Sequence, residues 1–283
     1  MKQHKWAPYL FLAPAVILFL SFTVYPILSS LILSFQRLDG GQYHFVGFSN
    51  YSRLFHDSVF LKALWNTFII FIFQVPIMLL LALVLANGLN SKRLKARGLF
   101  RVGFFLPSVT SLVAYSILFS IILQDTGIMN TFLGLFGIDT IHWLADPVWA
   151  KVSIILAMTW RWTGYNMVIY LAAMQNITED MYEAASLDGA GKIRQFFSVT
   201  IPQLKPVILF TAVISTISTL QLFDEPFNLT KGGPADATMT LGLYIYQNGF
   251  QYFDFGYASA IAYVVVILMA VLSWVQMKVT GED

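Results

Sequence analysis

A continuous apolar run, YLFLAPAVILFLSFTVYPILSSLILSF from Tyr9 to Phe35, indicates the fold class of this chain. About 20 predominantly apolar residues are enough for a helix to cross the hydrocarbon core of a bilayer. Lipid offers no partner for open backbone N–H and C=O groups, so such a run is expected to be helical. It is also too long for the apolar core of a secretory signal, and no A-x-A-like cleavage site follows Phe35.

The composition of the whole chain agrees with this interpretation. Of its 283 residues, 57% are hydrophobic and 11% are charged, and the mean hydropathy is +0.68. A soluble domain with these values would expose very large apolar patches. A β-barrel would need short alternating segments, whereas these runs are continuous. We therefore predict an all-α integral membrane protein, one domain over residues 1–283 with six transmembrane helices at about 8–35, 67–86, 102–123, 152–174, 207–223 and 258–277.

Lysine and arginine are distributed unequally between the two sides of these spans. Cytoplasmic loops hold the excess of basic residues in membrane proteins. One side carries Lys2, Lys5, Lys92, Arg93, Lys95, Arg97, Arg101, Lys192, Arg194, Lys205 and Lys278, and the other carries Arg37, Arg53, Lys62, Lys151 and Lys231. The distribution predicts that both termini are cytoplasmic, together with the loop at about 178–201.

Few motifs for chemistry occur in the chain. There is no G-x-x-x-x-G-K-[ST] sequence, so we do not expect this chain to be an enzyme that hydrolyses nucleotide by itself. The four histidines are not at metal-ligand spacing, and no metal site is expected. The positive-inside bias explains the basic cluster SKRLKARGLFR, so nucleic-acid binding is not needed to account for it. The chain has no cysteine, so it forms no disulfide and has no thiol chemistry.

Arg161, in TWRWTGYN, lies in the middle of the fourth span. A central arginine costs about 2.5–3.5 kcal/mol on insertion scales, so it should face protein or a wet cavity. Two interpretations have equal weight. Either the guanidinium pairs with a carboxylate on a neighbouring chain, or it lies beside a substrate path.

The fifth span has a stripe of small polar residues. Helical steps of three and four residues place one set on a single face: Thr211, Ser215, Ser218, Thr219 and Leu222. Hydroxyls on one face of a membrane helix usually indicate tight helix packing, and the alternative is a polar cavity. Polar residues near the outer end of this span favour access of water there: Gln221, Asp224 and Glu225.

The fourth span has a second stripe. Trp160, Thr163, Gly164 and Met167 share one face, and Gly164 leaves space beside an aromatic ring. An indole with neighbouring hydroxyls suits a sugar, whose C–H face lies on the ring while its hydroxyls find donors and acceptors. Packing explains each stripe alone. Both together, without catalytic groups, favour a transport pathway.

The charged segment EAASLDGAGKIRQFF, Glu183–Phe197, interrupts the apolar runs. We expect a helix capped by Thr178 that ends at Gly189, a typical residue just past a helix end. A second helix is expected from about Lys192 to Val199, ending before Pro202. The pair is either an amphipathic hairpin on the membrane surface or a contact for a protein socket, and its acidic first helix favours the socket.

The stretch EAASLDGAGKIRQFFSVTIPQLKP resembles the EAA signature of binding-protein-dependent ABC importer permeases. The matching residues are Glu183, Ala184, Ala185, Gly189, Ile201 and Pro202, and the D-G-A form found in sugar permeases adds Asp188 and Ala190. FVGFSNYSRLF, LTKGGPADATMTLGLYIYQNGF and FGYASAIAYVVVIL resemble further parts of the maltose-transporter-type first permease. The resemblance implies the type I permease fold in the cytoplasmic membrane of a bacterium.

The resemblance also implies how the chain is coupled to its partners. It places the contact with a cytoplasmic ATPase subunit at Glu183, Ala184, Ala185, Asp188 and Gly189. Implied partners are a second homologous permease, two ATPase subunits, an extracytoplasmic solute-binding protein, a carbohydrate substrate and membrane lipid, without nucleic acid. ATP and Mg would be bound by the ATPase subunits, and no cofactor is expected in this chain.

Alignment with the maltose system places the sugar contacts on the two stripes. They fall on Trp160, Gly164, Met167, Ser215, Ser218, Thr219 and Leu222. We therefore expect the permease subunit of an ATP-driven importer of a mono- or oligosaccharide. Arg161 leaves a glycerol phosphate or an acidic sugar open as the substrate. A self-contained secondary transporter is the alternative class.

Overall fold

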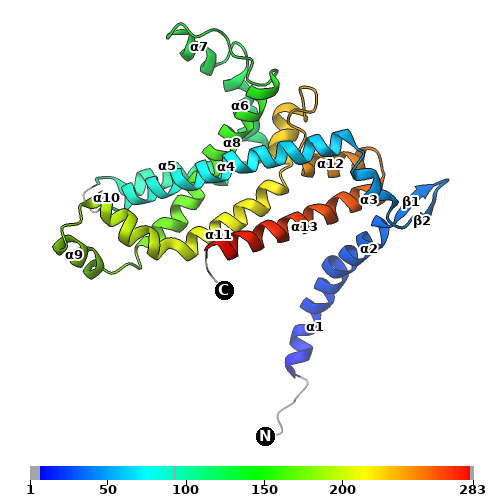
Figure 1. Cartoon of the computed structure of the whole chain (residues 1–283), viewed down its shortest axis with the longest axis horizontal. Helices are drawn as coiled ribbons and strands as arrows, with labels where there is room; N and C mark the ends of the chain where they lie inside the picture. The colour runs from blue at the N-terminus through cyan, green and yellow to red at the C-terminus, as the bar shows by residue number, and fades with distance from the viewer. Residues whose placement is uncertain (1–6, 92–93, 281–283) are drawn as a thin grey trace. The chain divides into compact units, whose positions relative to one another are not determined.

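The computed structural model describes residues 7–91 and 94–280 (Figure 1). Within these residues the chain forms two compact units. The first unit consists of the described residues up to Ser58 together with Tyr244–Val266. The second unit consists of Val59–Leu243 together with the described residues from Ile267 onwards. Two helices, α12 (Leu241–Tyr246) and α13 (Phe255–Thr280), contribute several residues to both units, and the first residue of a third helix, Ser58, is the last residue of the first unit's early part.

The predicted all-α membrane fold is confirmed. In the described residues, helices at Tyr9–Ser34, Ser58–Asn90, Leu112–Gly134, Lys192–Leu220 and Phe255–Val279 are long and apolar enough to cross a membrane by length and composition. A further long helix, α8 (Pro147–Met174), has 28 residues. The sheet found in the described residues is a single two-stranded hairpin, β1 (Gln36–Asp39) with β2 (Gln42–Phe45).

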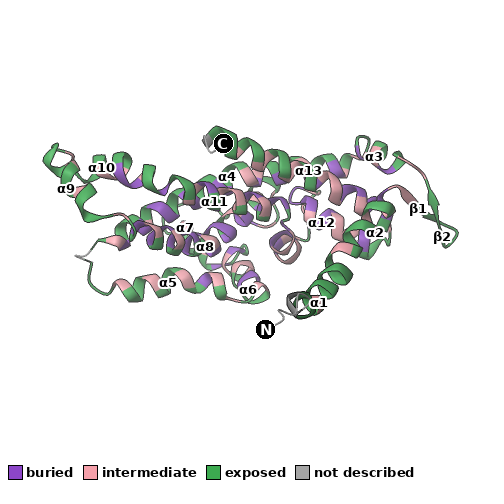
Figure 2. Ribbon diagram, turned by 90° about the horizontal axis from the view of Figure 1, so that it is seen from below, coloured by how far each residue is buried: buried purple, intermediate pink, exposed green. Residues whose placement is uncertain are grey.

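The first unit begins with one continuous helical segment. It consists of α1 (Ala7–Phe19), the π-helical turn η1 (Leu20–Val24) and α2 (Tyr25–Ser34). No residue is buried in the 18-residue window by which this segment qualifies as a membrane span, and most of its ribbon is exposed in Figure 2. This surface is apolar, as lipid contact requires. The unit continues through the hairpin, α3 (Ser49–Leu54) and η4 (Gln247–Gln251) to the first half of α13.

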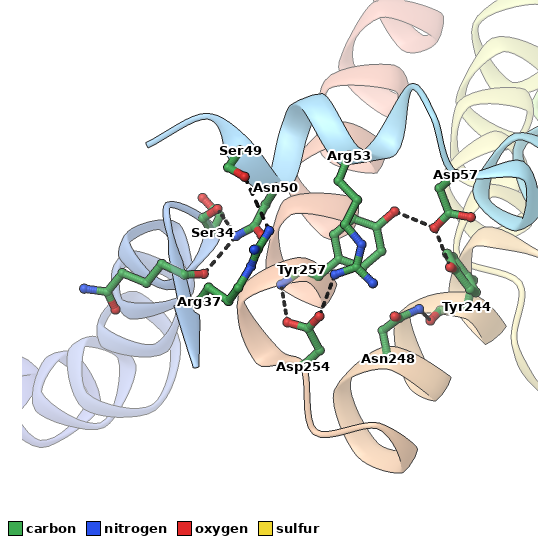
Figure 3. Close-up of polar contacts among 11 residues, drawn as sticks. Ser34, Arg37, Ser49, Asn50, Arg53, Asp57, Tyr244, Asn248, Asp254 and Tyr257 are labelled. Carbon is green, nitrogen blue, oxygen red and sulfur yellow. Dashed lines mark hydrogen bonds and ion pairs between the residues drawn. The ribbon is translucent and has the colours of Figure 1, made fainter. Parts of the chain in front are cut away.

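Polar side chains connect the early and late parts of the first unit (Figure 3). Arg53 forms a 2.8 Å ion pair with Asp254, and its guanidinium lies 3.8 Å from the ring centre of Tyr257. Asp57 accepts hydrogen bonds of 2.6 Å from the hydroxyls of both Tyr244 and Tyr257. Burial raises the pKa of Tyr244, so this hydroxyl remains a donor to the carboxylate.

The second unit contains the two longest helices of the described residues, α4 (Ser58–Asn90, here from Val59) and α8. Its other helical elements include α5 (Arg97–Val109), α6 (Leu112–Leu123), α7 (Ile128–Gly134), α9 (Glu179–Leu187), α10 (Lys192–Gln195), η2 (Phe196–Thr200), α11 (Ile201–Leu220) and η3 (Pro226–Thr230). Asp146 caps α8, because its Oδ1 accepts from the backbone N–H groups of Val148 and Trp149. Helices α9 and α10 lie together at one end of this unit (Figure 1).

Close packing fixes the position of α8 in the second unit. Its Gly164 lies so near the α5 backbone that an added Cβ would overlap the Phe104 carbonyl group. On another side, buried residues of α8 join α4 and α11 in one apolar core, which includes Met78, Ala82, Met167, Tyr170 and Leu204. Small residues at helix contacts are the usual way to bring membrane helices together.

The predicted third span, at about 102–123, is wrong as a single helix. It is broken into α5 and α6 at Thr110 and Ser111, whose ψ angles of 147° and 135° are extended. Pro107 contributes no backbone N–H, and both the N–H and the hydroxyl of Thr110 bond to the Pro107 carbonyl. Such a break is tolerated at membrane depth only where protein or a cavity surrounds it.

Two details predicted for the charged segment are also wrong. The second helix does not end before Pro202, because helical structure continues from Lys192 to Leu220. The π-helical turn η2 precedes Pro202, and the Ile201 N–H bonds to the Phe196 carbonyl there, so the helix widens where the proline offers no donor. Thr178 stands at the predicted cap position of α9, but its side chain makes no capping hydrogen bond.

Candidate functional site

A small polar cavity lies inside the second unit, between α4, α8 and α11. Its volume is about 60 Å³, room for a few ordered waters. It is lined by Gln74, Met78, Met158, Trp162, Tyr165, Asn166, Ile214, Ser215, Ser218 and Thr219. The polar groups in this lining are amides and hydroxyls, and none of these ten side chains carries a charge.

The two amides at this cavity share one weak acceptor, the sulfur of Met78. Gln74 is only 1% exposed, and its Nε2 donates to the sulfur of Met78 at 3.2 Å. Asn166 donates to the same sulfur at 3.6 Å, and the hydroxyl of Thr219 donates to Gln74 Oε1 at 3.3 Å. A thioether is a poor hydrogen-bond acceptor. Both amides can therefore exchange this partner for the hydroxyl of a ligand or water at small cost.

The structure brings some of the predicted pathway residues together. Ser215, Ser218 and Thr219 line the polar cavity, as the periodicity of the fifth span suggested. The remaining four lie elsewhere: Leu222 packs in an apolar cluster with Ile70 and Tyr115, and Met167 is fully buried in the core. The assignment of these four to a pathway stays a prediction.

Trp160 and Gly164 belong to a different cavity. It measures about 780 Å³, is formed by α4, α5 and α8, and is lined almost entirely by apolar side chains. Trp160 is 43% exposed and packs edge-to-face on Phe119, with ring centroids 5.4 Å apart. The indole at the polar cavity comes instead from Trp162, which lies on another face of α8.

Sequence reasoning missed the amides of the polar cavity. Gln74 sits in an otherwise apolar stretch of the second span, and Asn166 follows Trp162 by one helical turn. Polar residues inside a span are expensive and are usually functional. The presence of these two amides within apolar spans was therefore the sequence signal that could have located the cavity.

Arg161 lies in the second unit beside the break between α5 and α6. It is 7% exposed, and its Nη2 donates to the Thr110 carbonyl at 3.4 Å. The guanidinium carbon lies 4.8 Å from the ring centre of Tyr115 and 5.2 Å from that of Trp162. Nε and Nη1 have no hydrogen-bond partner among the described residues. A buried donor without a partner costs about 1–3 kcal/mol or more, so this arrangement is expensive.

A buried carboxylate completes this group. Tyr115 directs its hydroxyl to Glu225 Oε1 at 2.5 Å, and Glu225 is 4% exposed. The ring of Tyr115 therefore faces the cation while its hydroxyl binds the anion. Arg161 does not line the polar cavity between α4, α8 and α11.

The predicted coupling residues form an exposed helix and turn. No residue of α9 is buried, and Leu187 is 90% exposed. Gly189 has φ +77°, and its N–H bonds to the Ser186 carbonyl while the Ala190 N–H bonds to the Ala185 carbonyl. This is the Schellman geometry predicted for a glycine just past a helix end.

A shallow groove follows one side of α9. It is lined by Glu179, Tyr182, Glu183, Ser186 and Leu187. Side-chain bonds hold the two arms of the turn together, since Gln195 donates to Ser186 Oγ at 2.8 Å and to the Ala190 carbonyl at 2.9 Å. Glu183, Ala184, Asp188 and Gly189 are exposed, and Ala185 is half-buried. In the described residues, no group of three or more His, Cys, Asp or Glu side chains could hold a metal.

The sequence of this chain matches a known protein family. The family described as "Binding-protein-dependent transport system inner membrane component" matches residues 45–279. The chain belongs to this family. These transport components are integral membrane permeases, in agreement with the apolar helices of the structure.

Relatives of this permease carry names that refer to sugar transport. It is 52% identical over 279 residues to the lactose transport system permease protein LacF of Rhizobium radiobacter, covering 97% of this chain and 94% of that protein. It is 38% identical over 283 residues to the arabinooligosaccharides transport system permease protein AraP of Bacillus subtilis, covering 99% and 90%. It is also 36% identical, over 274 residues, to the sulfoquinovosyl glycerol transport system permease protein SmoG of Agrobacterium fabrum, covering 95% and 89%.

Solved structures confirm the permease fold. A chain of a bacterial alginate ABC transporter, in complex with an alginate pentasaccharide-bound periplasmic protein, superposes with a TM-score of 0.86 at 24% identity. The match covers 99% of this permease and 96% of that chain. At this identity the likeness establishes the fold alone.

Proposed function

We propose that this chain is the membrane-spanning permease subunit of an ATP-binding-cassette importer for a mono- or oligosaccharide. The observation that carries the substrate class is the uncharged cavity, which is lined by the amides of Gln74 and Asn166, by hydroxyls such as that of Thr219 and by the indole of Trp162. Amides and hydroxyls both donate and accept, as sugar hydroxyls require, and an indole packs on the C–H face of a sugar ring. The names of the relatives point to the same class.

Charge favours a neutral sugar over an acidic sugar or a glycerol phosphate. A carboxylate or phosphate taken out of water needs a cation or several strong donors nearby. The polar cavity offers no charged side chain, and Arg161 lies outside its lining. The pathway of this chain is therefore matched to an uncharged substrate.

The cavity of about 60 Å³ is smaller than a sugar residue. In our proposal this chain supplies one wall of the pathway, and a second homologous permease supplies the other. The large apolar cavity that contains Trp160 offers an apolar surface that a membrane-embedded partner or lipid can cover.

The exposed turn at Gly189 supports coupling to a separate motor. The acidic groove at Glu179 and Glu183 offers carboxylates to a basic residue of a partner, and the exposed Leu187 offers an apolar anchor. We assign two ATPase subunits to this surface, and they would bind the ATP and Mg. A solute-binding protein would deliver the sugar on the opposite side of the membrane.

The basic residues support an orientation in the bacterial inner membrane with both termini cytoplasmic. Lys192, Arg194, Lys205 and Lys278 lie on the same side as α9 in this orientation. Transport would then proceed by alternating access, driven by the different contacts that nucleotide and binding protein make in two states.

Reconstitution tests the proposed function. The chain carrying an affinity tag is purified from its native host, and the co-purified subunits are placed in vesicles with the cognate solute-binding protein. We expect an ATPase to co-purify and ATP to drive uptake of a neutral probe, lactose or an arabinooligosaccharide, but not of an alginate pentasaccharide. Uptake of the acidic probe alone would contradict the neutral class. Sugar uptake by this chain without any ATPase would identify a secondary transporter.

A further inference from the structure

Arg161 is a buried cation that the proposed transport cavity does not use. It lies on α8 next to Trp162, yet its guanidinium is directed to the Thr110 carbonyl and the ring of Tyr115. A cation within a membrane helix is retained only where protein groups compensate its charge. The role of Arg161 can therefore be inferred from the protein groups that surround its guanidinium.

The first of these groups is the break between α5 and α6. Extended backbone at Thr110 and Ser111 leaves carbonyl groups at the end of α5 without helical partners. The C-terminal end of a helix carries partial negative charge, which a nearby cation stabilises. Arg161 therefore fastens α8 to the point at which the α5–α6 segment is interrupted.

The second group is the pair formed by Tyr115 and Glu225. Tyr115 belongs to α6, and Glu225 immediately precedes η3. The tyrosine joins the two charges, because its ring lies against the guanidinium and its hydroxyl binds the carboxylate. Three segments far apart in sequence, α8, α6 and η3, thus meet at one buried cation and one buried anion.

We propose that Arg161, Tyr115 and Glu225 form a charge latch that positions the η3 segment during transport. This inference rests on the proposed function. In the orientation proposed above, η3 follows the outer end of α11, so the latch holds the outer part of the pathway in the conformation of this structure. Arg161 is a positioning residue and does not contact the substrate.

The latch has spare donors that suit a change of partner. Nε and Nη1 of Arg161 are buried without an acceptor among the described residues. A guanidinium with open donors can bind the Glu225 carboxylate directly when α6 and η3 shift. The two arrangements would then have different energies in the two states of the transporter, as a conformational switch requires.

Four variants of the complete transporter test the latch: Arg161→Gln, Glu225→Gln, Tyr115→Phe and the double variant Arg161→Gln with Glu225→Gln. Two controls are matched to them. Lys151→Gln removes a cation from the same helix nearer its start, and Tyr170→Phe removes another buried tyrosine hydroxyl, one that contacts Thr211. Each is measured for ATPase rate with and without the binding protein, for sugar uptake and for thermal stability of the purified complex.

Loss of the latch should uncouple the transporter. We expect each single variant to raise the ATPase rate without binding protein by about tenfold, within the range typical of coupling between sites. Sugar uptake should fall by a similar factor. The double variant should be less impaired than the two single changes combined, since it leaves neither charge alone in the interior. Both controls should keep the parental ratio of stimulated to basal ATPase rate.

Several results would overturn the latch. One is a set of variants that lose thermal stability but keep the parental ATPase ratio, which would make the cluster structural. Another is an Arg161→Gln protein whose only defect is weaker apparent affinity for sugar, which would make Arg161 a substrate residue. If Arg161→Gln does not assemble, Tyr115→Phe decides the question because it keeps both charges. A parental complex without uptake or ATPase would instead refute the proposed function.

Discussion

At the scale of single residues, the sulfur of Met78 is the common partner of the two cavity amides. Gln74 and Asn166 both donate to it, at 3.2 and 3.6 Å. A methionine is flexible and polarisable, so it can move aside without leaving an unpaired strong acceptor behind. The cavity thus keeps its amides satisfied when empty and releases them when a polar ligand enters.

Cysteine labelling tests the cavity lining in a chain that has no native cysteine. We expect Ser218→Cys to react with a small thiol reagent, because Ser218 is exposed and lines the cavity. A transported sugar should protect it. Thr216→Cys on the same helix should stay unreactive, since Thr216 is fully buried and its hydroxyl accepts from Gln276. Equal labelling at both positions, or a lack of protection at Ser218→Cys by any sugar, would return the hydroxyl stripe to a packing role.

Periodicity predicted faces of helices but not their neighbours. The three- and four-residue spacing was sufficient to find Ser215, Ser218 and Thr219, because one face of α11 meets the cavity. It could not show which of two tryptophans on α8 lines the same cavity, since each lies beside a cavity of its own. The prediction names Trp160, and Trp162 is the tryptophan that lines the cavity with these three residues.

At the scale of elements, the interrupted α5–α6 segment was hidden from sequence reasoning. Its residues are apolar on both sides of the break, so a hydropathy window sees one span. Pro107 was the local cue, but prolines also occur inside continuous helices, as Pro76 does in α4. The residue that compensates the break, Arg161, lies 51 positions further along the chain.

The helix α9 was predictable because its signals are local. Its acidic first turn and the glycine after its end both appear in the sequence and in the structure. The length of the helix that follows Gly191 was not predictable, because the π-helical turn η2 depends on how the chain accommodates Pro202. Local chemistry fixes helix ends better than it fixes the continuity of a long helix.

A pair of charge-neutralising variants tests the coupling surface. Glu183→Gln should reduce ATP-driven uptake at least about tenfold, because removing one partner of a charge pair at an interface typically costs 2–5 kcal/mol. Asp180→Asn removes the same charge from the first turn of α9, outside the groove, and should leave uptake within about twofold, a change of up to about 0.5 kcal/mol. Uptake and ATPase rate in reconstituted vesicles measure both. Similar losses in the two variants would show that only the total charge of α9 matters.

At the scale of the whole molecule, the first unit exists only because distant parts of the chain meet. Asp57 binds hydroxyls that are 187 and 200 positions away, on Tyr244 and Tyr257. Neither contact has a sequence signal, because a tyrosine hydroxyl has no pattern that specifies its partner. The hydropathy of the spans predicted the class of fold, whereas these contacts depend on the tertiary structure.

Replacing this carboxylate should destabilise the first unit. Asp57→Asn weakens two charge-assisted hydrogen bonds, and we expect a loss of about 1.5–3 kcal/mol in the free energy of unfolding. Asp39→Asn, at the exposed end of β1, should change it by less than about 0.5 kcal/mol. Thermal or denaturant unfolding in detergent measures both. An equal effect of the two substitutions would show that the two tyrosine contacts of Asp57 do not stabilise the unit.

The absence of any buried residue in α9 has a consequence for natural variation. Amino acids in a core are constrained by the packing of their own chain, so their substitutions register as lost stability. The exposed residues of α9 are less constrained by packing, and most substitutions there should have little effect on the stability of the protein. Restraint on the exposed residues of α9 that make no contact within the chain must then originate in another molecule, so the pattern of substitutions tolerated at those positions would trace the surface of the partner.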